Sequence, residues 1–282
     1  MQYLLVAAVL PIFLLCFFVY KKDPHYEPGK LLAKIFALGF FSALPILGIE
    51  MILEYFFPTD GISSFILIFI NVFISVALVE EGFKWLVTVF FGYKNKEFDE
   101  IYDIIVYAVF ASLGFACIEN ILYVFVHGFG NAILRALLSV PGHMCFGVIM
   151  GYFLAQAKVG KINKSASVYK RNMLLSILLP SIAHTLYDSF IFYAEYNILS
   201  ILLFFVFDIT MVILCIIIVN RMSKIQHNVD NYLNTGVIKT TDAGQLVFTP
   251  FNSNTHDIHY CPLCGSHVDG YNYCPRCGFK IK

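Results

Sequence analysis

The sequence predicts an all-α, polytopic membrane protein with about seven transmembrane helices and a small cytosolic zinc ribbon at its C-terminus. Three observations predict this fold: the composition, the length of the apolar stretches and a group of four terminal cysteines. Of the 282 residues, 59% are hydrophobic and 13% are charged, and the formal net charge is zero. This composition is far too apolar for a soluble domain of this size, and no nucleic-acid partner is expected.

Seven apolar stretches of about 18 residues or more are each long enough to cross a hydrocarbon core of about 30 Å. They cover residues 3–20, 31–57, 62–92, 104–126, 131–157, 172–194 and 198–220. The first is interpreted as a retained helix rather than a signal peptide, because no basic region precedes it and no small-residue cleavage site follows it. In the fifth, Pro141 and Gly142 predict a kink.

Lysine and arginine gather on alternate connections between these stretches. The basic connections hold Lys21, Lys22, Lys30, Lys34, Lys94, Lys96, Lys158, Lys161, Lys164, Lys170 and Arg171. The short turns near 58–61, 127–130 and 195–197 hold none. The positive-inside rule therefore predicts an N-terminus outside the cell and a C-terminal tail in the cytosol.

The polar tail predicts a linker followed by a metal-binding module. We assign residues 1–220 to the transmembrane domain, 221–257 to a linker with one short strand at 245–248, and 258–282 to the ribbon. The module holds two copies of C-P-x-C-G, with Cys261, Cys264, Cys274 and Cys277 as ligands. Four thiolates in the reducing cytosol complete a tetrahedral structural zinc site. The module resembles the zinc ribbons appended to many bacterial membrane proteins, which implies a cytosolic protein partner.

The other four cysteines, Cys16, Cys117, Cys145 and Cys215, fall within the apolar stretches and are interpreted as small buried residues.

Ionisable residues interrupt four successive apolar stretches, beginning with VALVEEGFKW at residues 76–85. Each costs about 2.5–3.5 kcal/mol at bilayer depth, so these groups should face the bundle interior and are functional candidates. They are Glu80, Glu81, Lys84, Glu119, His143, His184 and Asp188. A rise of about 1.5 Å per residue places most of them roughly 17–25 Å from the cytosolic ends. We therefore expect one layer of polar groups, with Glu80–Lys84 and His184–Asp188 each one helical turn apart.

Each of these groups also has a simpler interpretation when taken alone. Glu80 and Lys84 could form an ion pair without further function, and His143 could be a satisfied buried histidine. Together they supply a glutamate base, an imidazole to orient water or protonate a leaving group, and donors for an oxyanion. The same side chains could instead hold a catalytic zinc ion. Glu50, Glu54, Asn71 and Asp208 are interpreted as interhelical hydrogen bonds or interface residues.

Four motifs follow one another in order over roughly residues 75–190. They are E-E-x-x-K at Glu80–Lys84, F-x-x-x-E-N at Phe115–Asn120, P-x-H at Pro141–His143 and H-x-x-x-D at His184–Asp188. This ordered set resembles the PrsW family of bacterial intramembrane proteases. The resemblance implies a multi-pass protein of the cell membrane, related to the CAAX prenyl endopeptidases, that cleaves a membrane-anchored protein such as an anti-sigma factor.

The resemblance also implies roles for the polar layer and favours a mechanism without a metal. Glu80 or Glu81 would activate water that His143 positions. His184 and Asp188 would stabilise the oxyanion, with Asp188 either protonated or only orienting His184. Lys84 would balance the two glutamates and keep one of them ionised.

Two functions from other classes remain as alternatives. A proton-coupled transporter could use the same buried groups as a proton relay. No inverted repeat is evident in the helix pattern, which disfavours many transporter folds. A non-catalytic sensor or scaffold could instead bind its partner through the ribbon.

Overall fold

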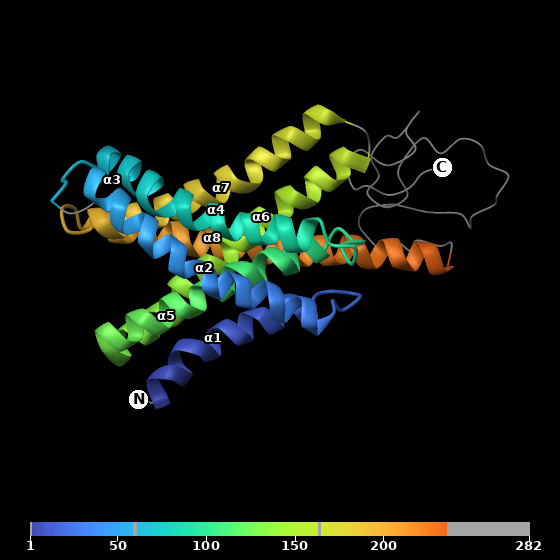
Figure 1. The fold of residues 1–282 in the computed structure, drawn as a ribbon, viewed down its shortest axis with the longest axis horizontal. Coiled ribbons are helices and arrows are strands. Elements are labelled where there is room, and N and C mark those ends of the chain that lie inside the picture. The colour runs from blue at the N-terminus through green and yellow to red at the C-terminus, as the bar shows by residue number, and fades with distance from the viewer. Residues whose placement is uncertain (1, 59–60, 163–164, 236–282) are drawn as a thin grey trace.

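The computed structural model describes residues 2–58, 61–162 and 165–235, in which the regular secondary structure is helical. The helices are α1 (Gln2–Lys21), α2 (Gly29–Phe56), α3 (Phe65–Val72), α4 (Leu78–Val87), α5 (Asp103–Leu137), α6 (Ser139–Ile162), α7 (Ala166–Tyr193) and α8 (Leu199–Thr235) (Figure 1). Two π-helical turns, η1 (Phe73–Ala77) and η2 (Thr88–Tyr93), flank α4. The predicted strand and the four cysteines of the ribbon lie outside the described residues.

A helix lies over each of the seven predicted stretches, so the all-α polytopic fold is confirmed. Within the described ranges, six helical spans are long and apolar enough to cross a membrane, as judged by length and composition. They are Gly29–Phe56, Phe65–Tyr93, Asp103–Gly130, Ile133–Lys161, Ala166–Tyr193 and Leu199–Gln226. The apolar part of α1, Leu5–Lys21, is shorter than these six.

The connections alternate between two ends of the bundle. Figure 1 shows the turn after α2, the far end of α5 and the turn after α7 at one end. The loops after α1 and after η2 lie at the other end, together with the end of α6 and the end of α8. The start of α1 and the end of α8 are therefore at opposite ends, as an odd number of crossings requires. Which end faces the cytosol stays a prediction.

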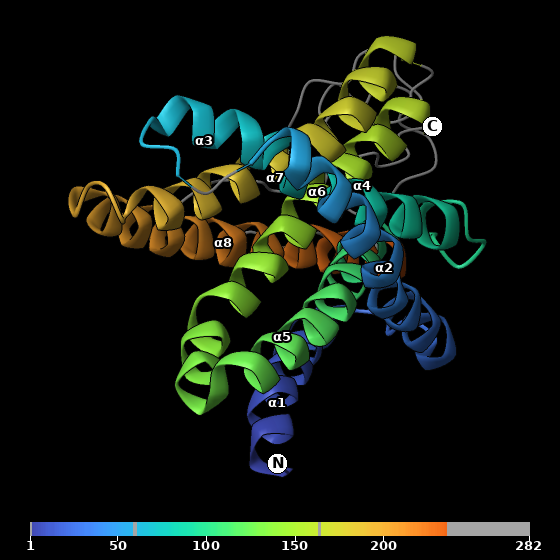
Figure 2. The ribbon, with the colours of Figure 1, turned by 60° about the vertical axis from the view of Figure 1, so that its left-hand side comes forward.

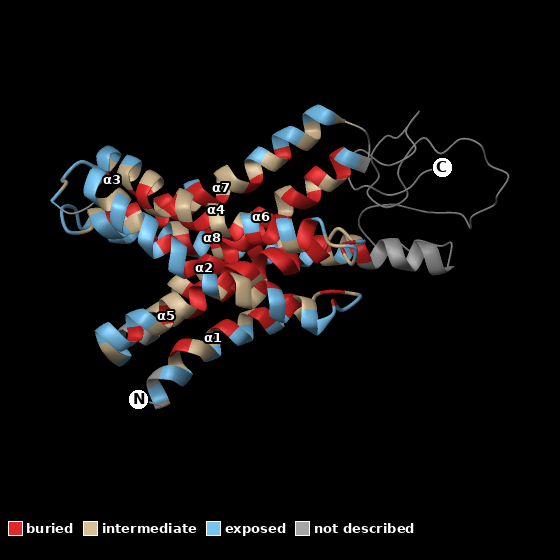
Figure 3. Cartoon of the chain, in the orientation of Figure 1, coloured by how far each residue is buried: buried red, intermediate tan, exposed pale blue. Residues whose placement is uncertain are grey.

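Helix α5 is the centre of the bundle. In its most apolar window 78% of the residues are buried, against 50% or fewer in the other five spans. Figure 3 shows the buried residues concentrated in the middle of the bundle, whereas the far end of α5 is largely intermediate or exposed. Gly39 of α2 and Gly114 of α5 allow the two helices to touch, because a Cβ on either glycine would overlap a backbone carbonyl of the other helix. Figure 2 shows α1 and the second half of α5 running away from α3 and α7.

Two backbone breaks shape the far end of α5. Gly128 has φ 79° and ψ −168°, which turns the chain before the helix resumes, and Leu138 separates α5 from α6 with φ −120° and ψ −65°. The stretch 131–157 is broken, as predicted, but the break lies at Leu138 and not at Pro141, which lies in the first turn of α6. There its missing N–H would have no partner within the helix, so the helix is not disturbed.

Helix α8 extends beyond its predicted end at residue 220. Residues 221–235, assigned to the linker from the sequence, are helical. This extension packs on the loop after α1, where Ser223 Oγ donates to the carbonyl of Lys22 and Met222 is buried. The four intramembrane cysteines are free and buried, as predicted.

Candidate active site

Lys84 is the centre of a buried polar network on α4. Because α-helical residues three and four apart share a face, its Nζ reaches both Glu80 Oε2 at 2.9 Å and Glu81 Oε1 at 2.8 Å. The side chain is fully buried, and Nζ also lies 4.2 Å from the ring centroid of Phe115. The π-helical turn η1 ends at Ala77, directly before this helix, and such turns are frequent at functional sites.

His143 connects this network to α5. Its Nδ1 lies 3.2 Å from Lys84 Nζ, and its Nε2 lies 2.8 Å from Glu119 Oε2. An ammonium group can only donate, so Nδ1 of His143 must accept and its proton resides on Nε2, which donates to Glu119. These contacts assign His143 as a neutral imidazole with both nitrogens engaged.

His184 lies between two carboxylates. Its Nδ1 is 3.1 Å from Glu81 Oε1 and 3.8 Å from Glu80 Oε2, and its Nε2 is 3.3 Å from Asp188 Oδ2. Phe146 stacks on the imidazole with a centroid separation of 4.7 Å, which fixes the plane of the ring. Ionised carboxylates can only accept, so this environment favours an imidazolium at His184 that donates from both nitrogens.

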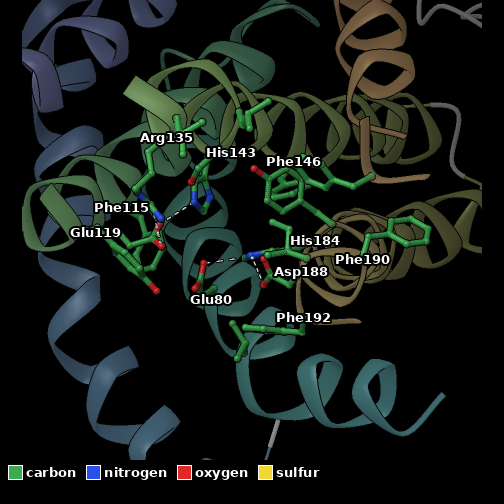
Figure 4. Close-up of a pocket in the computed structure, with 18 of the residues that line it drawn as sticks. Glu80, Phe115, Glu119, Arg135, His143, Phe146, His184, Asp188, Phe190 and Phe192 are labelled. Atoms are coloured by element: carbon green, nitrogen blue, oxygen red, sulfur yellow. Dashed lines mark hydrogen bonds and ion pairs between the residues drawn. The ribbon is translucent and has the colours of Figure 1, made fainter. Parts of the chain in front are cut away.

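A cavity of about 690 Å³ opens beside these groups (Figure 4). Its polar wall includes five of the predicted residues, Glu80, Glu119, His143, His184 and Asp188, together with Glu50 and Arg135, and its remaining wall is largely aromatic and aliphatic. Glu81 and Lys84 are absent from the lining and have no exposed surface. The structure therefore brings all seven predicted residues into one connected network, as the depth count predicted, and divides them into cavity-lining and supporting groups.

Arg135 is a member of this network that was not included among the predicted site residues. Its Nη2 lies 3.0 Å from Glu119 Oε1, and its Nε donates to Asn120 Oδ1 at 2.9 Å. Asn120 in turn donates to the carbonyl of Ala8 on α1 at 2.7 Å. Arg135 is near Glu119 because the break at Gly128 redirects the end of α5. The glycines in H-G-F-G at residues 127–130 are the sequence signal of that turn.

Glu50 was interpreted as an interface residue, but it lines the same cavity from α2. Its Oε1 accepts no hydrogen bond from the described residues. Asn71, which was also interpreted as a hydrogen-bonding or interface residue, donates to the carbonyl of Pro58 at 2.5 Å. Asp208 is buried, and its Oδ1 has no hydrogen-bond partner within the described ranges.

Three of the network residues have the donor set of a metal site. One ligand atom from each of Glu80, Glu81 and His184 lies within 4.8 Å of the others. Carboxylate and imidazole are the ligands of many catalytic zinc ions, so the donor types fit. The Lys84 ammonium is hydrogen-bonded to both glutamates, and a metal ion would compete with it for these carboxylates.

A bundle of membrane-spanning helices that buries a glutamate pair, a lysine and two histidines beside a cavity has the architecture of an intramembrane hydrolase. A family model described as "PrsW family intramembrane metalloprotease" matches residues 27–219, and the chain belongs to this family.

Curated relatives named Protease PrsW agree with this membership. The chain is 42% identical to the protein of Oceanobacillus iheyensis over 185 residues, which cover 66% of this chain and 81% of the relative. It is 40% identical to the protein of Bacillus subtilis (strain 168) over 184 residues, 64% of this chain and 79% of the relative. No solved structure matches the chain. The protein is thus a multi-pass bacterial membrane protein of a protease family, which favours the peptidase hypothesis over a transporter or scaffold.

Proposed function

We propose that this protein hydrolyses a peptide bond of a membrane-anchored protein substrate, with Glu80 as the general base. Glu80 is favoured over Glu81 because it lines the cavity, whereas Glu81 is fully buried behind it. The observation that carries the proposal is the position of Lys84 Nζ, 2.9 Å from Glu80 and 2.8 Å from Glu81. This internal cation favours the ionised form of both glutamates. The Lys84 ammonium donates to Oε2 of Glu80, which leaves Oε1 of Glu80 to accept a proton.

In the proposed reaction, Glu80 takes a proton from a water molecule as the water oxygen attacks the substrate carbonyl carbon. The oxyanion forms beside the His184 imidazolium, whose Nε2–H can be shared between Asp188 and the substrate oxygen. Glu80 then gives its proton to the amide nitrogen as the C–N bond breaks. His143 has two protein partners, so we assign it to holding Lys84 and Glu119 in place rather than to holding the water.

The family description names a metalloprotease, and a metal would find its ligands in Glu80, Glu81 and His184. Such an ion, when bound, would act as a Lewis acid that activates water. The contacts of Lys84 with both glutamates support the metal-free alternative, because the ammonium already neutralises part of their charge.

Metal content and activity measured together decide between these mechanisms. The full chain with Cys261, Cys264, Cys274 and Cys277 replaced by Ser should cleave a membrane-anchored reporter without stoichiometric transition metal. Chelators should leave its rate unchanged. One equivalent of zinc in this variant, with activity lost on chelation and restored by zinc, would establish the metal mechanism instead.

We propose that residues 258–282 form a separate cytosolic ribbon in which the four cysteines bind a structural zinc ion. The repeated C-P-x-C-G supports this assignment. Replacing Cys264 and Cys277 by Ser should remove this zinc while cleavage stays measurable. Loss of all cleavage in a well-folded variant would make the ribbon part of the catalytic unit.

An anti-sigma factor is the candidate substrate that the family resemblance suggests, and the ribbon is a candidate docking site for a cytosolic partner.

A further inference from the structure

Five carboxylates gather at the end of the bundle where α8 ends, apart from the candidate active site. We call Asp23, Glu27, Asp99, Glu100 and Asp103 the loop carboxylate cluster. Asp23 and Glu27 lie in the loop after α1, and the others lie between η2 and the first residue of α5, beside it in Figure 1. One ligand atom from each of Asp23, Glu100 and Asp103 lies within 4.8 Å of the others. The same holds for Glu27, Asp99 and Asp103.

The three central members of the cluster are almost completely removed from solvent. Asp103 has no exposed surface, and Asp23 and Glu27 are 4% and 6% exposed. Burying like charges together is costly unless a cation or a proton neutralises them. In agreement with this, burial and neighbouring carboxylates raise the pKa of Asp23 to about 7, although the hydrogen bond from the His25 backbone opposes the shift. Burial also raises the pKa of Glu27.

The protein supplies little positive charge to the cluster. Two basic groups face it: His25 pairs with Glu100 at 2.5 Å, and Lys158 Nζ donates to the carbonyl of Phe98 at 2.8 Å. Among the described residues Lys158 forms no ion pair with Asp23, Glu27 or Asp103, although Lys158 interacts electrostatically with Asp103 and His25 interacts electrostatically with Asp23. Tyr107 donates its hydroxyl to Glu27 Oε2 at 2.5 Å, which satisfies that oxygen but brings no charge.

The buried oxygens Asp103 Oδ1 and Asp23 Oδ2 have no hydrogen-bond donor among the described residues. Asp103 Oδ2 accepts the backbone N–H groups of Asp99 and Glu100, at 3.2 and 2.7 Å, but no donor within the described ranges reaches Oδ1. Asp23 Oδ1 accepts the N–H of His25, and Oδ2 likewise has no partner. An unsatisfied buried carboxylate oxygen is a costly feature, and it is the ligand that a hard cation prefers.

We propose that the loop carboxylate cluster binds a hard divalent cation of the Mg²⁺ or Ca²⁺ class, with Asp103 as the ligand shared between its two halves. Such ions take several carboxylate and carbonyl oxygens, and their charge would neutralise the buried acids. The cation would join the loop after α1 to the start of α5. Asp103 and Glu119 are 16 residues apart on that helix, about 24 Å along its axis, so the site is separate from the candidate active site.

The test uses the full chain in lipid nanodiscs, stripped with EDTA and then titrated with MgCl₂ or CaCl₂ while thermal unfolding is followed. We expect a saturable rise in Tm with a midpoint on the order of 1 mM or lower, and Asp103→Asn should abolish it. Because Asp103 also accepts two N–H groups at the start of α5, Asp23→Asn is a second variant for the case that Asp103→Asn fails to fold. Glu97→Gln is the matched control, since Glu97 lies in the same loop but its side chain is 41% exposed and paired with Lys96.

Two further measurements separate cation binding at the cluster from binding at the active site and from protonation. Glu80→Gln should keep the full cation response, which shows that the active-site glutamates are not its source. A proton is the competing occupant of the cluster. If acidification from about pH 8 to about pH 6 raises Tm in the absence of cation, and MgCl₂ or CaCl₂ adds nothing at pH 8, protons neutralise the acids and the proposal is overturned. Absence of any response in the wild type, or a full response in a folded Asp103→Asn or Asp23→Asn variant, also overturns it.

Discussion

The candidate active site and the loop carboxylate cluster both bury several acidic side chains, but they neutralise them in different ways. In the active site, Lys84 pairs with Glu80 and Glu81, and Arg135 pairs with Glu119. In the loop cluster, the hydrogen-bond donors that reach Asp103 and Asp23 from the described residues are backbone N–H groups. A site whose charges are balanced by its own side chains can stay ionised and ready to move protons. A site without such cations depends on an ion or a proton from solution.

This comparison predicts the largest effect for removal of the internal cation at Lys84. Lys84→Met would leave Glu80 and Glu81 buried without their shared partner, which costs about 3–5 kcal/mol of unfolding free energy when one member of a buried pair is removed. We expect no cleavage of a membrane-anchored reporter and a clearly lower Tm. Lys96→Met is the control, because the Lys96 side chain is 90% exposed and should be replaceable without effect. Normal activity in Lys84→Met would show that the glutamates do not need this cation.

Glu80→Gln should remove activity with little loss of stability. The amide has the shape of the carboxylate and can still accept from Lys84, but it cannot take a proton from water. Loss of a general base typically costs about 10²–10⁴-fold in rate. Cleavage rates and thermal unfolding measured on the same preparation separate the two effects. His143→Ala should also be inactive while it stays folded. If the cleavage rate of Glu80→Gln lies within a few-fold of the wild-type rate, another residue must be the general base.

Arg135 should have a smaller effect, because it acts through Glu119. Arg135→Lys keeps the charge, but a single ammonium cannot reproduce the separate contacts of Nη2 with Glu119 and Nε with Asn120. We expect a rate reduced by about 10-fold, in the range of a lost charge-assisted hydrogen bond. If Arg135 positions Glu119, Arg135→Lys should retain more activity than Arg135→Met. Equal loss in both variants would indicate that the guanidinium itself contacts the substrate.

The sequence predicts the helices and the polar layer because bilayer thickness and helical rise leave little freedom. The number of residues between each predicted cytosolic helix end and Glu80, Glu119, His143 or His184 is enough to predict that these four lie at one depth. The same estimate does not predict that Arg135 lies near Glu119. It assumes straight helices, whereas Gly128 turns the end of α5.

The loop carboxylate cluster could not be predicted from the sequence for another reason. Asp23 and Asp103 are separated by 80 residues and lie in or beside loops, where no periodic pattern relates one position to another. Only the packing of the two loops brings them together.

Glu50→Gln should have the smallest effect, although Glu50 lines the same cavity as Glu80. Its Oε1 accepts no hydrogen bond from the described residues, and it has no ion pair with Lys84 or Arg135. Replacing it with the neutral amide therefore breaks no contact of the network within the described residues, and we expect a rate within about 3-fold of the wild type, less than one lost hydrogen bond would give. Asp208→Asn, outside the cavity, is the matched control. A loss of 100-fold or more in Glu50→Gln, with Tm unchanged and Asp208→Asn active, would place a second carboxylate in the chemistry.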